Sequence, residues 1–259
     1  MAQPVTQGQV IRSEWIKLRT VRSSWFVLGA TLLGIAGIGL LVAYFTNAGW
    51  STMSASARAD FSPINQSLLG VNLAELMVGA LGVLAATREY GSGMIRATFA
   101  AVPRRLPVLV AKAAVLAGAT FVVCLVAVLI AFLGGQALFG SHGISLSHPD
   151  AVRAVFGSTL YLTVVAVLGT GLGFLIRSTA AGIATLLAVL LVLPIIVAAL
   201  PGSTAEAVGR YLPSTAGRAV FTMNAGHAML SPWPGFGIFL LYAVLVMAAA
   251  ALALRRRDA

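Results

Sequence analysis

Charged residues are scarce in this 259-residue sequence, and the shortage decides its class. Asp, Glu, Lys and Arg make up 9% of the chain, whereas they make up about 25% of an ordinary soluble domain. Hydrophobic residues make up 59%. Such a chain cannot cover a folded core with a water-soluble surface. The composition therefore excludes a soluble globular protein and predicts a membrane protein.

Cysteine and lysine are also rare. The single Cys124 excludes a disulfide within the chain and any CxxC or Cys/His metal cluster. The two lysines follow Ile16 and Ala111, so the Gly-Lys-Ser/Thr element of a phosphate-binding loop is missing. We therefore expect no metal, no cofactor and no ATPase site in this chain.

Six stretches are apolar and long enough to cross a bilayer, which takes about 20 helical residues. Trimmed at clusters of Gly, Pro, Asn and Ser, they cover residues 25–45, 68–86, 109–133, 152–176, 179–200 and 235–254. These stretches use most of the chain and leave no room for a separate soluble domain. The sequence predicts an all-α, polytopic membrane protein in which residues 1–259 form one six-helix domain.

The net charge of +10 is unevenly distributed along this six-helix map. With both termini in the cytoplasm, four basic residues lie outside and thirteen inside; the thirteen are Arg12, Lys17, Arg19, Arg22, Arg88, Arg96, Arg104, Arg105, Lys112, Arg177, Arg255, Arg256 and Arg257. Basic residues gather on the cytoplasmic side of membrane proteins, so the bias predicts cytoplasmic N- and C-termini in the cell membrane. It also explains the positive charge without a nucleic-acid partner and favours contact with anionic lipid in the bilayer.

Residues 10–25 have the pattern of an interfacial helix ahead of the first span. At 100° per residue, the apolar side chains fall within one stripe, formed by Ile11, Trp15, Leu18, Val21 and Trp25. Amphipathic helices of this kind lie on a membrane surface, and Trp is typical of the interface. The alternative is a basic flank that only fixes the topology.

The longest charged cytoplasmic segment, residues 87–107, joins the second and third spans. Gly91 and Gly93 allow the chain to turn off the membrane helix, and Ser92 can cap a new one. Pro103 ends the pattern, which leaves a helix of about ten residues. Such a helix suits docking of a partner, and the alternative is an ordinary charged loop.

At these residues the chain resembles bacterial ABC transporter permeases of the type-2, exporter class. Glu-Tyr, then Gly, a short helix, Pro103, Arg105 and Lys112 follow the order of the family's linker. Met94 stands where many relatives carry Thr. Three further segments, residues 12–19, 177–180 and 212–217, resemble the actinobacterial branch.

The resemblance implies a transport subunit rather than an enzyme. Two six-span permeases would pair, and each would dock a separately encoded cytosolic ATPase that binds ATP and Mg and drives export. The residues then implied in ATPase coupling are Glu89, Tyr90, Gly91, Gly93, Arg96, Pro103, Arg104, Arg105 and Lys112. Those of the interface helix are Arg12, Glu14, Trp15, Lys17, Leu18 and Arg19.

Two other classes stay open at this point. An intramembrane enzyme would have to use Ser145 with His148, or His142 with His227, but the residues around Ser145 lack the second Gly of a nucleophile elbow. An ion-coupled secondary carrier would need several ionisable groups within its spans, and only Glu75 lies in one. Glu75 is either a pathway residue or a carboxylate that is protonated or satisfied by a neighbouring helix.

Overall fold

The computed structural model describes residues 6–256 except 103, 202 and 224–228. Helices and connecting turns make up this part of the chain, which contains no strand. Six of its helical stretches are long and apolar enough to cross a membrane, as the sequence predicts. They are α2 (Arg22–Ala48), α5 (Val71–Gly91), α7 (Leu106–Phe139), α8 (Pro149–Ile176), α9 (Thr179–Leu187) continuing through η3 (Ala188–Val192) into α10 (Leu193–Ala198), and α13 (Pro232–Arg256).

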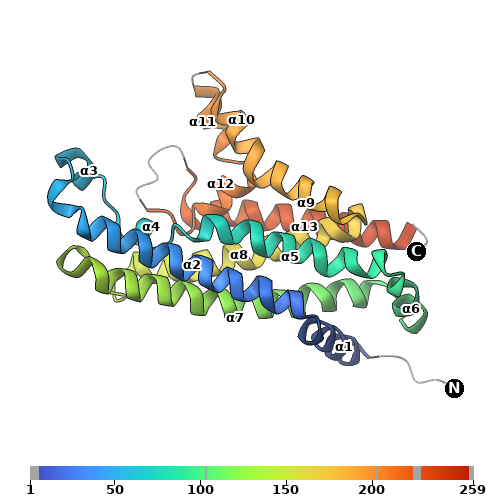
Figure 1. The fold of residues 1–259 in the computed structure, drawn as a ribbon. Coiled ribbons are helices and arrows are strands. Elements are labelled where there is room, and N and C mark those ends of the chain that lie inside the picture. Colours follow the sequence, from blue (N-terminus) through green and yellow to red (C-terminus); the bar gives the residue numbers. More distant parts are fainter. Residues whose placement is uncertain (1–5, 103, 202, 224–228, 257–259) are drawn as a thin grey trace.

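The short elements gather at the two ends of this helical bundle. They are α1 (Gln7–Thr20), η1 (Trp50–Thr52), α3 (Ala55–Ala59), α4 (Pro63–Ser67), α6 (Met94–Ala101), η2 (Gly140–His142), α11 (Ser203–Gly209) and α12 (Pro213–Arg218). Figure 1 shows α1 and α6 at the same end as both chain termini, with α3 and α11 toward the other end. The interfacial and docking helices of the sequence analysis thus meet at one end of the molecule.

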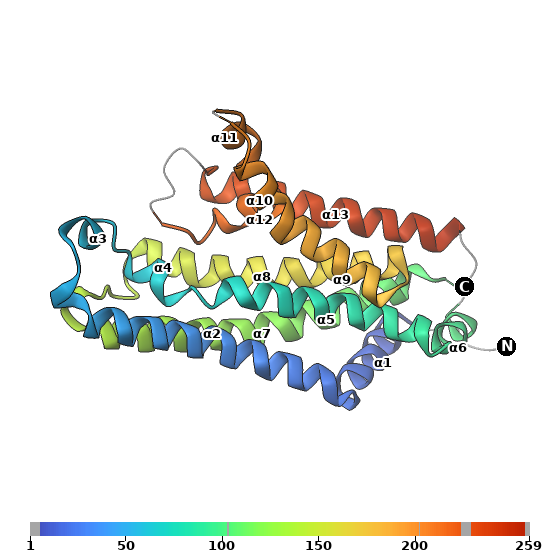
Figure 2. The same ribbon diagram turned by 45° about the horizontal axis from the view of Figure 1, so that its top comes forward.

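Helix α8 forms the centre of the bundle. It packs against α5, α7, α9 and α13, and it is the most deeply buried of the six spans. Figure 2 shows it running between α13 on one side and α5 and α7 on the other.

Glycines allow α5 and α8 to touch backbone to backbone. A Cβ atom on Gly82 would overlap the carbonyl oxygen of Ala166, and one on Gly169 would overlap that of Gly79. Gly173 lies against Val83 in the same seam. Small residues at such contacts let membrane helices approach closely, so this pair is held by dense van der Waals packing.

The observed spans are longer than the predicted ones at several ends. Helix α7 runs on past residue 133 through Gly134 and Gly135 because these glycines pack against Leu40 and Ser67 inside the bundle rather than marking a turn. Helix α5 ends at Gly91 instead of residue 86, so Arg88 and Glu89 belong to the span helix. The docking helix is correspondingly shorter than expected.

The fifth span contains a π-helical turn. Pro194 has no N–H to donate to the carbonyl of Leu190, and its ring crowds that carbonyl. The wider π turn at η3 (Ala188–Val192) directly precedes it. The span continues beyond the turn into α10 (Leu193–Ala198), and α10 and α11 lead away from the bundle in both views.

We predict that Gly82→Ala destabilises the protein by about 1–3 kcal/mol, because the added methyl overfills a closed helix contact. Gly118→Ala is the matched control, since nothing lies within 4 Å of a Cβ at that position. Thermal unfolding in mild detergent measures both. Equal melting temperatures for the two variants would contradict the close α5–α8 contact.

Candidate functional site

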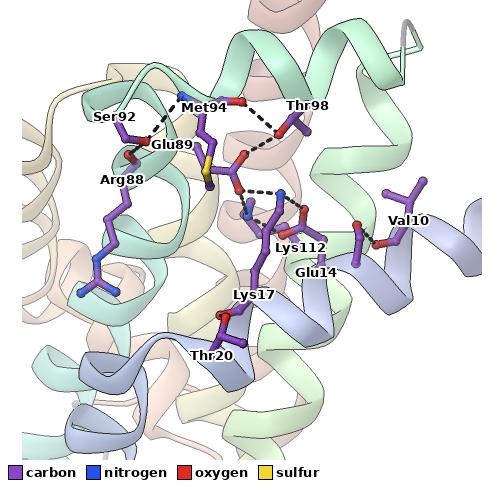
Figure 3. Close-up of polar contacts among 11 residues, drawn as sticks. Val10, Glu14, Lys17, Thr20, Arg88, Glu89, Ser92, Met94, Thr98 and Lys112 are labelled. Carbon is purple, nitrogen blue, oxygen red and sulfur yellow. Dashed lines mark hydrogen bonds and ion pairs between the residues drawn. The ribbon is translucent and has the colours of Figure 1, made fainter.

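Four charged side chains from three helices meet at the end of the bundle that carries the termini. The ammonium of Lys112 on α7 lies 2.5 Å from Glu14 Oε2 on α1 and 2.6 Å from Glu89 Oε1 on α5. Lys17 Nζ lies 2.7 Å from Glu14 Oε1 and 3.0 Å from Glu89 Oε1. We call these residues the four-charge cluster (Figure 3).

The four-charge cluster is electrically balanced and largely dry. The side chains of Glu14, Glu89 and Lys112 are 3%, 5% and 7% exposed, and that of Lys17 is 28% exposed. Buried charges persist only when they are paired, so two carboxylates and two ammonium groups stabilise one another here. Burial lowers the pKa of Lys17, but the hydrogen bonds and charges of Glu14 and Glu89 outweigh that effect and raise it above its ordinary value.

Helix α6 is attached to this cluster. Thr98 donates a hydrogen bond of 3.2 Å from its hydroxyl to Glu89 Oε2. Ile95 and Phe99 bury the inner face of α6 in an apolar core shared with Val10 of α1. Gly93 has a φ of 72°, a left-handed conformation that favours glycine and reverses the chain between α5 and α6.

The opposite face of α6 is open. Met94, Arg96, Ala97 and Ala100 are exposed on it. A helix with one face fixed in the bundle and the other free can transmit a contact from outside to the helices behind it.

The chain after α6 is fixed to other spans. Arg105 donates a hydrogen bond of 3.0 Å to the carbonyl of Leu254 on α13, and its guanidinium lies 5.3 Å from the Phe99 ring centroid. The Tyr90 ring packs edge-on against Phe174 of α8. Residues 87–102 and 104–107 thus pack on the bundle rather than forming a loose loop.

Comparison with known proteins agrees with this arrangement. Residues 10–200 match the model of a family described as ABC-2 family transporter protein. The match covers more than half of the chain. The chain belongs to the ABC-2 family. A search of curated proteins finds no match.

The structure brings together residues that the sequence assigned to two separate sites of this ABC-2 protein. Glu14 and Lys17, predicted for the interface helix, lie in one cluster with Glu89 and Lys112, predicted for coupling. The predicted residues that remain exposed outside the cluster are Arg12, Trp15, Arg19, Gly91, Gly93, Arg96 and Arg104. Leu18 is half-buried, and Pro103 lies outside the described residues.

Two details of the sequence interpretation are wrong. The helix predicted over residues 10–25 breaks at Val21, so Trp25 belongs to the first turn of α2. Ser92 does not hold the cap position of α6, which Gly93 takes.

Glu75 lies in a second ionic contact, nearer the other end of α5. It is 1% exposed, accepts a hydrogen bond of 2.5 Å from the Tyr161 hydroxyl and forms an ion pair with Arg218 of α12. Arg218 is 143 residues from Glu75 in the sequence, but α12 packs against α13 and α8, which brings this guanidinium to the carboxylate. Glu75 therefore holds the short helix α12 against the spans.

The residues considered for an enzyme do not form a nucleophile–base pair. The Ser145 hydroxyl donates to the Ser147 hydroxyl, and the His148 ring accepts from the Asp150 N–H at the start of α8. His142 stacks on Trp50 with ring centroids 3.9 Å apart. His227 lies outside the described residues.

We expect Lys112→Met to lower stability by about 3–5 kcal/mol, because it leaves two buried carboxylates with a single ammonium group. Glu89→Gln added to Lys112→Met should recover part of the loss, since it removes one of the unpaired charges. The exposed Arg96→Gln serves as the control. Unfolding in detergent measures all three, and a Lys112→Met variant as stable as Arg96→Gln would contradict the buried cluster.

For Glu75, we predict that Glu75→Gln destabilises the protein by about 1–3 kcal/mol and loosens α12, because Arg218 loses a charged acceptor. Limited proteolysis of residues 203–223 and thermal melting follow the two effects. Glu206→Gln, a change of an exposed acid on the neighbouring α11, should alter neither. A Glu75→Gln variant with wild-type stability and protease resistance would show that the ion pair does not hold α12.

Proposed function

We propose that this ABC-2 protein is the membrane-spanning permease subunit of an ATP-driven exporter of the type-2 class, of the actinobacterial branch. It forms the substrate pathway, while a separately encoded ATPase subunit binds ATP and Mg at the cytoplasmic side. The family match and six apolar helices support the permease role. The missing Gly-Lys-Ser/Thr element supports ATP hydrolysis by a separate subunit.

The attachment of α6 to the four-charge cluster carries the coupling part of the proposal. ATP binding elsewhere can shift the permease between states only through a contact that differs between those states. The exposed face of α6 is the contact surface in this proposal. Thr98 connects α6 to Glu89, and Glu89 connects to α1 and α7 through the two lysines. A displacement of α6 would therefore be transmitted to α1, α5 and α7.

The proposal also sets the orientation of the chain in the cell membrane. Helices α1 and α6 and the last turn of α13 share one end of the bundle (Figure 1), and the basic residues of the sequence concentrate there. The positive-inside rule supports a cytoplasmic location for this end. Trp15 and Ile16 on α1 expose 46% and 51% of their surface, which suits contact with the inner leaflet of the bilayer.

A second permease copy, identical or paralogous, completes the proposed assembly. The outer half of the fifth span exposes a run of large apolar side chains at Leu191, Val192, Leu193, Ile195 and Ile196. This half also leaves the bundle (Figure 2), and only 22% of the fifth span is buried inside the chain. A partner helix packed there would cover this surface.

The test is co-purification of the affinity-tagged full chain from its native membranes in mild detergent. We expect a protein with a phosphate-binding loop among the co-purifying subunits. Arg96→Glu should reduce its recovery several-fold, because a docking contact meets a reversed charge. Arg58→Glu, at the opposite end of the bundle, should leave recovery unchanged. Recovery of no such protein, or equal recovery with both variants, would refute the docking role of α6.

A further inference from the structure

A cavity lies beside the four-charge cluster, inside the elbow between α1 and α2. Its volume is about 470 Å³, and α1, α2, α5, α6 and α7 all contribute to its wall. Ligand pockets in proteins typically measure about 300–1,000 Å³. The cavity therefore has room for a small ligand or for part of a larger one.

One positively charged group in the cavity wall has no oppositely charged partner among the described residues. Lys17 and Lys112 bind both Glu14 and Glu89, so these four residues cancel. Arg88 also lines the cavity, and its guanidinium makes no hydrogen bond or ion pair within the described part of the chain. Figure 3 shows it extended away from the cluster. The wall thus has a net charge of +1 and a free guanidinium.

A second unused donor lies across the cavity. Ser24, in the first turn of α2, is only 5% exposed and lines the cavity, yet its hydroxyl has no hydrogen-bond partner among the residues described. No side chain caps this end of α2, which is 27 residues long. The backbone N–H of Ser24 donates to the carbonyl of Val21, so the Ser24 hydroxyl is the open donor beside the partial positive charge of this helix N-terminus. The Arg88 guanidinium and the Ser24 hydroxyl therefore present donors for one negatively charged group.

The remaining wall is apolar. Leu18, Ala85, Val115 and Leu116 line it. The cavity lies where α1 joins the first span and α5 ends, at the end of the bundle with both termini. At this depth a membrane offers lipid headgroups with acyl chains directly below them.

We propose that this cavity binds an anionic glycerophospholipid of the adjacent leaflet. Its phosphate would lie between Arg88 and the start of α2, and the first part of one acyl chain would follow the apolar wall. The net charge of +1 favours a lipid with a net negative headgroup over a zwitterionic one. The site shares Met94 with the exposed face of α6 but requires no partner subunit, so lipid binding can be measured on this chain alone.

Native mass spectrometry of the delipidated full chain tests the site by titration with phosphatidylglycerol, phosphatidylcholine or inorganic phosphate. Wild type should hold one phosphatidylglycerol, and bind phosphatidylcholine and phosphate at least about tenfold more weakly. Arg88→Gln should weaken phosphatidylglycerol binding by about tenfold or more. Arg255→Gln, an exposed arginine near the end of α13, is the matched control and should bind as wild type.

A second variant separates the lipid site from a change in folding or from surface charge. Val115→Phe keeps every charge and fills the apolar wall, so it should also weaken phosphatidylglycerol binding while the melting temperature stays at the wild-type value. Wild-type binding by both Arg88→Gln and Val115→Phe would overturn the proposal. Equal losses of phosphatidylglycerol binding in Arg88→Gln and Arg255→Gln would show that general electrostatic attraction to the surface, and not the cavity, binds the lipid. If phosphate displaced the lipid at equal concentration, the cavity would be a site for a free anion and not for a lipid.

Discussion

The buried ammonium group of Lys112 is the constraint on which the end of the bundle that carries α1 and α6 depends. It has a carboxylate from α1 on one side and a carboxylate from α5 on the other, and all three side chains are at least nine-tenths buried. Removing any one of them leaves an uncompensated charge in an apolar surrounding. Thr98 of α6 donates a hydrogen bond to the Glu89 carboxylate, so α1, α5, α6 and α7 are held in one arrangement. A displacement that keeps these pairs intact must therefore move the four helices together.

Helix α5 extends this constraint along the bundle. Glu89 and Glu75 are 14 residues apart on it, which corresponds to about 21 Å at 1.5 Å per residue. Glu89 belongs to the four-charge cluster, and Glu75 binds Arg218 of α12 and Tyr161 of α8. Helix α5 thus carries one ionic attachment beside α6 and another to α12. A shift of α5 along its axis would strain both.

The sequence predicted the class of fold because hydrophobic run length alone limits what can cross a bilayer. It also named all four members of the buried cluster, but it assigned Glu14 and Lys17 to one role and Glu89 and Lys112 to another. These residues come together because the helix breaks at Val21, so that α1 packs back against α7. No Gly or Pro at this point in the sequence indicates the break. Arg218 was missed as the partner of Glu75 because its distance in sequence, 143 residues, carries no periodicity. Only the general cost of a lone acid within a span indicated that Glu75 needs a partner, and it did not say which residue supplies one.

The same packing also determines where the molecule can bend. The α5–α8 seam has backbone in contact with backbone, and α1, α5, α6 and α7 are joined through the four-charge cluster. The fifth span has neither kind of attachment. Only 22% of it is buried, and no ion pair holds it within the described residues. Its helix is interrupted at η3 (Ala188–Val192), where the π turn ahead of Pro194 weakens the regular hydrogen bonding. Regions with few buried contacts open at the lowest free energy. Bending at η3 therefore costs less than breaking the cluster, so a stroke delivered to α6 would move the joined helices as one body and alter their angle to α10.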